Sequence, residues 1–145
     1  KQWINQRLKS IEVRKELTNE WNVRGMKKGI EYAILTDEIT KAWSGMTTRE
    51  YKDFKSLKKE NLRDNMTNLE LVLNMLAEAS TTEISKEKKP KTLKENKQVA
   101  KKGGKVADVA RKQLEKNTKK KVISPNNAKE LGIRKEDQAG KEIKE

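Results

Sequence analysis

The sequence predicts an all-α fold: a small helical domain of about five to seven helices, with a basic helical hairpin near the C-terminus and a frayed tail. Apolar residues recur at helical spacing in several segments, as Ile4, Leu8 and Ile11 do in the first. Capping boxes, in which a Thr and a Glu three residues later exchange hydrogen bonds with each other's backbone, predict where three helices begin. They pair Thr47 with Glu50, Thr67 with Glu70 and Thr92 with Glu95.

The first part of the chain is predicted to contain two helices joined by a loop. Gly25 and Gly29 punctuate a lysine-rich loop after the opening helix. We expect residues 32–35 to form a short strand or an extended lead-in. Asp37, or the Thr before it, then caps a helix that ends at Gly45, because glycine is favoured directly after a helix.

A short helix is expected after Thr47, and a longer one after Thr67. The longer helix is apolar on two sides, which predicts a central position with partners on both. Leu69, Val72, Leu73 and Leu76 lie on one side, and Leu71 and Met75 on the other.

The basic hairpin is predicted beyond Pro90, which breaks the preceding helix. Its first helix begins at Thr92 and ends at Gly103-Gly104, and its second covers residues 105–117. Another short helix, closed by Gly132, is expected to follow Ser124-Pro125. We therefore divide the chain into a helical core domain (1–89), a basic helical extension packed on it (90–132) and a disordered tail (133–145).

Composition excludes several classes of chemistry. The 145-residue chain has no Cys and no His, so it holds no disulfide, no Cys/His zinc site and no histidine-dependent catalytic group. Its apolar stretches are far shorter than the ~18 residues that a membrane-spanning helix needs. Lys1 leads directly into polar sequence without a signal peptide. We expect a cytoplasmic protein with no membrane partner and, because Lys1 is not Met, a fragment of a longer one.

The positive charge is concentrated in one segment. The formal net charge is +13, of which +11 lies within residues 86–124, whereas residues 1–85 carry +2 and residues 125–145 carry zero. Of the 15 basic residues in that segment, all but Arg111 are lysines. Lysine favours phosphate attraction over bidentate contacts to bases, so we expect little sequence preference.

The predicted hairpin arranges these residues as a nucleic-acid-binding site. Lysines share one face of each helix, the intervening glycines let the backbone approach an anion, and a lysine cluster follows. The candidates are Lys94, Lys97, Lys101, Lys102, Gly103, Gly104, Lys105, Arg111, Lys112, Lys116, Lys119, Lys120 and Lys121. The alternative is an ordinary solvated face in which Asp108 pairs with Lys112 and Glu115 with Lys119.

Three other patterns in the sequence suggest different sites. The segment around Gly45 could be a helix-turn-helix that presents Thr48, Arg49 and Lys52 to DNA, although ordinary hairpin packing is favoured. Trp21 and Trp43 could stack on bases, but core positions are favoured. Asp37, Glu38, Asp53, Glu60 and Asp64 could bind Mg²⁺ in a nuclease, but no spacing singles them out. We therefore predict no metal, no cofactor and no catalytic residue.

Blocks of the sequence resemble the DNA-damage-inducible protein D family. The main blocks are residues 32–52 (YAILTDEITKAWSGMTTREYK) and 57–71 (LKKENLRDNMTNLEL), and shorter ones lie at 79–84, 95–107, 111–115 and 122–124. The similarity covers about residues 21–127. Members of this family and its phage antirepressor relatives usually carry a Bro-type N-terminal domain before this region, so the resemblance implies a C-terminal fragment.

The resemblance implies a bacterial or prophage protein of the SOS response that acts by binding rather than catalysis, and it implies no catalytic residues. Together with the basic segment, it leads us to expect DNA as the partner; the sequence leaves open whether the DNA is single- or double-stranded. The alternative is an antirepressor-like module that docks on a repressor or recombination protein.

Overall fold

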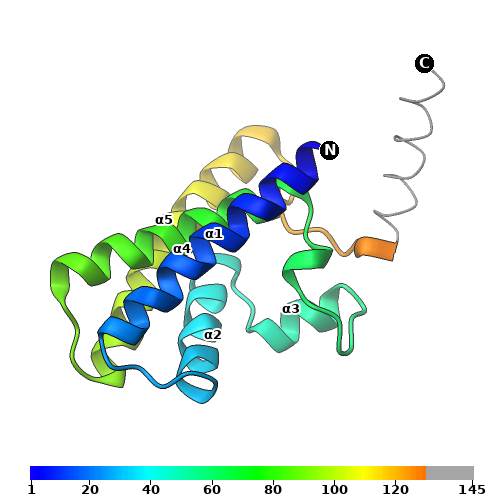
Figure 1. Cartoon of the computed structure of the whole chain (residues 1–145). Helices are drawn as coiled ribbons and strands as arrows, with labels where there is room; N and C mark the ends of the chain where they lie inside the picture. Colours follow the sequence, from blue (N-terminus) through cyan, green and yellow to red (C-terminus); the bar gives the residue numbers. More distant parts are fainter. Residues whose placement is uncertain (130–145) are drawn as a thin grey trace.

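The computed structural model describes residues 1–129 and is all-helical over that range, which confirms the predicted fold class (Figure 1). The predicted end of the last helix at Gly132 and the predicted tail lie outside the described residues. The helices are α1 (Gln2–Val23), α2 (Ile30–Ser44), α3 (Thr48–Phe54), the short 3₁₀ helix η1 (Arg63–Asn65), α4 (Asn68–Lys88) and α5 (Leu93–Thr118).

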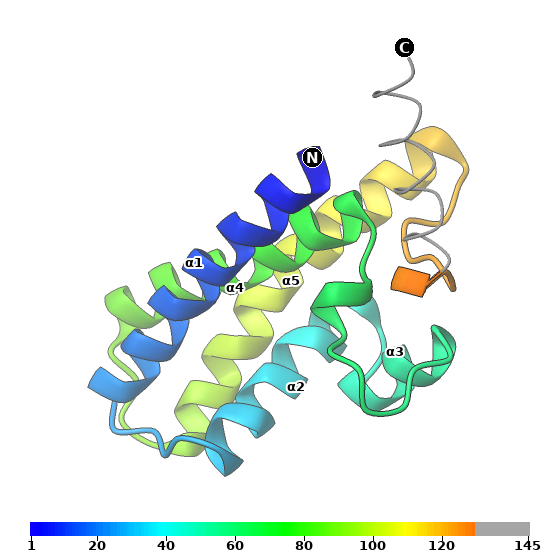
Figure 2. The ribbon, with the colours of Figure 1, turned by 45° about the vertical axis from the view of Figure 1, so that its right-hand side comes forward.

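Helix α4 is the centre of the fold, as predicted. It packs against α1 and α5 along most of its length and also contacts α2, which in turn packs on α5 (Figure 2). Helix α3 and η1 lie together at one end of the bundle. Because α5 contributes Val99, Ala100 and Ala107 to the buried interior, the basic helix is part of the packed structure. Among residues 1–129, none of the helices combines the length and apolar character that a membrane crossing requires.

The buried side of α4 is more polar than its apolar pattern suggests. Leu71 is fully buried, but so are several polar residues that form hydrogen bonds or ion pairs with α1 and α2. Glu78 accepts from Arg14 at 3.0 Å, and Ser85 Oγ donates to Glu20 Oε2 at 2.6 Å. The predicted apolar side of α4 that contains Leu69, Val72 and Leu76 partly faces solvent instead. Leu69, Val72 and Leu76 are 41%, 37% and 37% exposed.

All three predicted capping boxes are present. In each, the Thr side chain accepts from the backbone N–H of the Glu, and the Glu side chain accepts from the backbone N–H of the Thr. These boxes start α3, α4 and α5. The sequence predicted these three helix starts correctly, because a capping box depends only on residues three positions apart.

The predicted strand or extended segment at residues 32–35 is wrong, because α2 already begins at Ile30. Gly29 provides the start with a φ of +88°, and Leu35 is fully buried one turn before Ile39. Helical spacing of this buried pair outweighs the local β propensity of the segment. Thr36 consequently lies inside the helix, where its hydroxyl donates to the carbonyl of Tyr32.

The predicted break at Gly103-Gly104 is also wrong: α5 is one continuous helix of 26 residues, so the basic segment is not a hairpin. The two glycines are buried where α5 approaches its neighbours. A Cβ on Gly103 would overlap the Thr81 hydroxyl oxygen and lie 2.7 Å from the Thr81 Cα on α4. A Cβ on Gly104 would lie 2.7 Å from the carbonyl oxygen of Ile39 on α2. These glycines therefore permit close helix packing rather than a turn.

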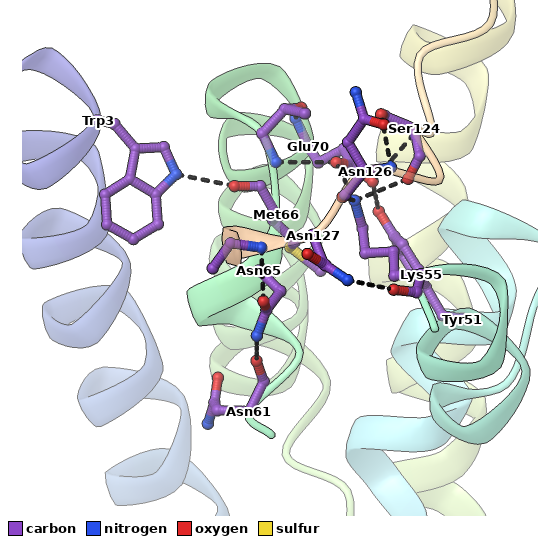
Figure 3. Close-up of polar contacts among 12 residues, drawn as sticks. Trp3, Tyr51, Lys55, Asn61, Asn65, Met66, Glu70, Ser124, Asn126 and Asn127 are labelled. Atoms are coloured by element: carbon purple, nitrogen blue, oxygen red, sulfur yellow. Dashed lines mark hydrogen bonds and ion pairs between the residues drawn. The ribbon is translucent and has the colours of Figure 1, made fainter. Parts of the chain in front are cut away.

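A buried ion pair fastens the chain beyond α5 to the rest of the fold. Lys55 and Glu70 are both fully buried, and Lys55 Nζ lies 2.8 Å from Glu70 Oε1 (Figure 3). The Lys55 ammonium also donates to the carbonyl oxygens of Ser124 and Asn126, each at 2.7 Å. Glu70 is the capping-box residue of α4, so one carboxylate serves both the helix start and this ion pair.

Further contacts hold the same region. Tyr51 donates its hydroxyl hydrogen to Glu70, and burial, reinforced by the Glu70 charge, raises the pKa of Tyr51 well above its usual value. Asn127 donates to the carbonyl of Lys55 at 3.0 Å. The expected helix start at Ser124-Pro125 is displaced, since helical structure resumes only at Ala128. The main-chain carbonyls before it are turned toward Lys55 instead.

Replacing Gly103 by Ala should destabilise the protein by about 1–3 kcal/mol, because the added methyl group has no space beside Thr81. Helix propensity alone would give the opposite sign, a gain of about 1 kcal/mol. Urea denaturation followed by circular dichroism measures the difference. Gln98→Ala, at an exposed position of the same helix, should stay within about 0.5 kcal/mol of the parent protein. A Gly103→Ala variant as stable as the parent would contradict the close packing.

Lys55→Met should cost about 3–5 kcal/mol of unfolding free energy, because it leaves the Glu70 carboxylate buried without its counter-charge. Adding Glu70→Gln should recover part of the loss, since Gln also supports a capping box and carries no charge. A double-mutant cycle from urea denaturation measures the coupling. A coupling energy near zero would show that the two charges do not depend on each other.

Candidate nucleic-acid interface

The continuous course of α5 sets which of its residues face outward. Successive residues of an α-helix are rotated by about 100°. Asn96, Ala100, Gly103 and Ala107 fall on the side that packs on α2 and α4, and all four are buried. The lysines are distributed around the remaining surface.

Five exposed lysines form one row along α5, which we call the lysine stripe. They lie within about 60° of one another around the helix, and the row extends for about 33 Å. The stripe consists of Lys94, Lys101, Lys105, Lys112 and Lys116. A hairpin would have divided these residues between two helices, whereas the continuous helix aligns them.

The other predicted lysines lie around the stripe. Lys97 is half-buried at the edge nearer the core, and Lys102 is exposed on the opposite flank. Lys119 caps the end of α5 in the left-handed conformation, with φ +58°. Lys120 and Lys121 are exposed on the chain that leaves the helix.

Three predicted site residues do not lie on the exposed surface of α5. Gly103 and Gly104 are buried against α4 and α2, so their backbone cannot approach an anion as proposed. Arg111 is turned inward and its side chain is 13% exposed. Its guanidinium pairs with Asp108 at 2.9 Å and Glu115 at 3.1 Å, and it donates to the carbonyl of Trp43 at 2.9 Å. Arg111 therefore joins α5 to the end of α2.

Asp108 is embedded in the stripe and pairs with two of its lysines. Its carboxylate lies 3.3 Å from the ammonium of Lys105 and 3.0 Å from that of Lys112. Burial opposes ionisation of Asp108, but hydrogen bonds from Lys112, Arg111 and Lys105 outweigh it and lower its pKa. The Asp108–Lys112 pair, which belonged to the alternative interpretation of an ordinary solvated face, is thus present. The Glu115–Lys119 pair of the same alternative is replaced, because Glu115 pairs with Arg111 and accepts from the Val122 N–H.

A groove of about 570 Å³ runs beside the stripe between α5 and α2. Its α5 side includes Lys101 and Lys105, and its α2 side includes Lys41 and Glu38. Glu38 lies 3.6 Å from the ammonium of Lys101. Lys41 was not among the predicted candidates, since no local pattern in the sequence relates it to lysines sixty residues away.

The secondary candidates lie in a different place. Thr48, Arg49 and Lys52 line a second groove, of about 520 Å³, together with residues of α1 and α2 and none of α5. The Thr48 N–H donates to Asp37 Oδ1 at 2.7 Å, and the Arg49 side chain is 76% exposed. These three residues are therefore not an extension of the stripe along the first groove.

The carboxylates weighed as a metal site do not gather. Across residues 1–129, no group of three or more acidic residues could hold a metal ion. They are engaged separately: Asp64 with Arg7, Asp53 with Arg49, and Glu60 with the Lys58 N–H. Trp21 and Trp43 are 1% and 0% exposed, so both belong to the core, as favoured.

No family model, curated protein or solved structure matches this chain significantly. The functional interpretation therefore depends on the geometry and charge of the described residues.

Proposed function

We propose that this chain is a non-enzymatic, DNA-binding domain that contacts the phosphate backbone through α5, within a bacterial or prophage protein of the DNA-damage response. The observation that carries the proposal is the lysine stripe, five exposed lysines aligned on a single helix. The damage-response role follows the sequence resemblance, and the basic surface supplies the physical means of binding.

Charge on the stripe is only partly compensated. Asp108 pairs with Lys105 and Lys112, and Glu38 pairs with Lys101, whereas Lys94 and Lys116 have no carboxylate within 4 Å among the described residues. Lys41 adds a further positive charge across the groove. The three paired lysine side chains are 62–64% exposed, so their ammonium groups remain accessible to phosphates.

The stripe suits phosphate contact without base recognition. Lysine ammonium groups act as compact point charges, and each phosphate they neutralise releases condensed counterions. Six or more such contacts, which the five lysines of the stripe and Lys41 can supply together, support non-specific binding with a dissociation constant of about 10⁻⁴–10⁻⁶ M at physiological salt. Arg111, which has the geometry for bidentate contact to guanine, is occupied by Asp108 and Glu115. Binding is therefore expected to be steeply salt-dependent and indifferent to sequence.

Replacing Lys94, Lys105 and Lys116 together by Gln should reduce the slope of log affinity against log salt by about three. It should also weaken DNA binding roughly tenfold or more at low salt. Fluorescence anisotropy with labelled DNA at several salt concentrations measures both quantities.

The matched control replaces the exposed residues Lys9, Lys15 and Lys28 by Gln, which lowers the net charge by the same amount. This control should bind DNA nearly as the parent does. Equal losses in the two triple variants would show that net charge, not the stripe, determines binding.

Asp108→Asn should act in the opposite direction and tighten DNA binding about fivefold, equivalent to about 1 kcal/mol, because a negative charge is removed from the stripe.

A second candidate function, docking on a repressor or recombination protein, is favoured by the exposed apolar row of Leu69, Val72 and Leu76 on α4. Apolar residues aligned on an exposed face often mark protein interaction sites. The row is separate from the stripe, because it lies on another helix.

Val72→Lys should abolish capture of a partner from damaged bacterial cells while leaving DNA binding unchanged, because a charge is placed within the apolar row. The measurement is a pull-down performed after nuclease treatment, with the exposed Glu83→Lys of the same helix as control. Capture that disappears completely with nuclease would show that DNA alone bridges the proteins.

A further inference from the structure

We infer that the ligand of the stripe is double-stranded DNA, with two lysine pairs of α5 contacting the two phosphate walls of one groove. The inference rests on the proposed function and adds the strand state of the ligand. Three features of the described residues support it: the spacing of the lysines, the rigidity of the helix that carries them and the burial of the aromatic side chains.

The stripe contains two lysine pairs with identical internal spacing. Lys101 and Lys105 form one, and Lys112 and Lys116 form the other; in each, the residues are one helical turn apart. The pairs are offset by eleven residues, which is about 16 Å along the helix axis. The major groove of B-form DNA is about 12 Å wide between its phosphate walls. Flexible lysine side chains on each pair can therefore reach opposite walls of the same groove.

The helix holds this spacing rigidly. At the first pair, α5 is seated on α2 and α4 through Gly103 and Gly104, where the backbones approach too closely for a side chain. At the second pair, Arg111 ties α5 to the carbonyl of Trp43. The two pairs therefore keep a constant separation.

A duplex presents two phosphate walls at a fixed separation, whereas a single strand must be ordered to meet both pairs. Proteins that bind single strands usually compensate for this ordering by stacking bases on aromatic side chains, worth about 1–3 kcal/mol per base. Here Trp21, Trp43 and Tyr51 are at most 1% exposed. Trp3 and Tyr32 are partly buried against the core, and Phe54, on α3, is the only exposed aromatic residue among residues 1–129.

The charge density of the ligand points the same way. Double-stranded DNA carries about one negative charge per 1.7 Å of axis, twice that of one strand. Over the ~33 Å of the stripe, close to one turn of the duplex, the lysines meet a dense and regular array of phosphates. Lys41, across the groove beside α2, adds a contact to the same surface.

The test measures binding of the full chain to two labelled ligands. One is a duplex of about two helical turns, and the other is a non-pairing single strand with the same number of phosphates. Anisotropy at low and at physiological salt gives the ratio of the two affinities. We expect the duplex to bind about tenfold more tightly. Lys112→Gln/Lys116→Gln should reduce this ratio toward one, because a single pair cannot contact both walls.

The matched variant is Lys120→Gln/Lys121→Gln, which removes the same charge from exposed lysines beyond the helix and should keep the ratio. Phe54→Ala should leave affinity for the single strand unchanged. Single-strand binding as tight as duplex binding, and equally weakened by the triple stripe variant, would overturn this inference and leave the proposed function standing. Absence of binding to either DNA at low salt would overturn both.

Discussion

The close packing of α5 at Gly103 and Gly104 is the constraint on which the rest of the structure depends. Thr81 and Ile39 approach the helix where a side chain would otherwise project. This contact places one side of α5 against both α2 and α4 and turns the opposite side outward. The orientation of every lysine on α5 follows from it. The two glycines that suggested a turn in the sequence therefore permit one continuous helix, which carries the lysines along a single exposed face.

The two parts of the chain use their charges differently. In the first 85 residues, many ionised groups are paired inside the fold: Glu78 with Arg14 and Arg63, and Glu20 with Arg24. These carboxylates are consequently not available to the lysines of α5. Of the stripe, only Lys101 pairs with a carboxylate from that part of the chain within the described structure. The excess charge thus stays on an exposed face, where it can attract a polyanion.

Lysine and arginine have separate tasks on α5. Arg111 uses its fixed planar geometry to bind two carboxylates and a backbone carbonyl at once, which suits a structural joint. The lysines of the stripe keep exposed, flexible side chains, which in the proposed function would adjust to phosphates without reading bases. Asp108 connects the two, because it orients Lys105 and Lys112 while it pairs with Arg111. If the proposed function holds, this arrangement would favour sequence-independent contact with the phosphate backbone of DNA.

Sequence alone determined the all-α class, the starts of α3, α4 and α5 at their capping boxes, and the location of the basic segment. Each depends on composition or on residues within one turn of each other, and in these cases the tertiary contacts agree with the local pattern. Tertiary structure decided the continuity of α5, the inward turn of Arg111, the role of Lys55 and the place of Lys41 beside the stripe. These depend on how closely helices approach and which side chains meet across them. Local patterns carry no information about such distances.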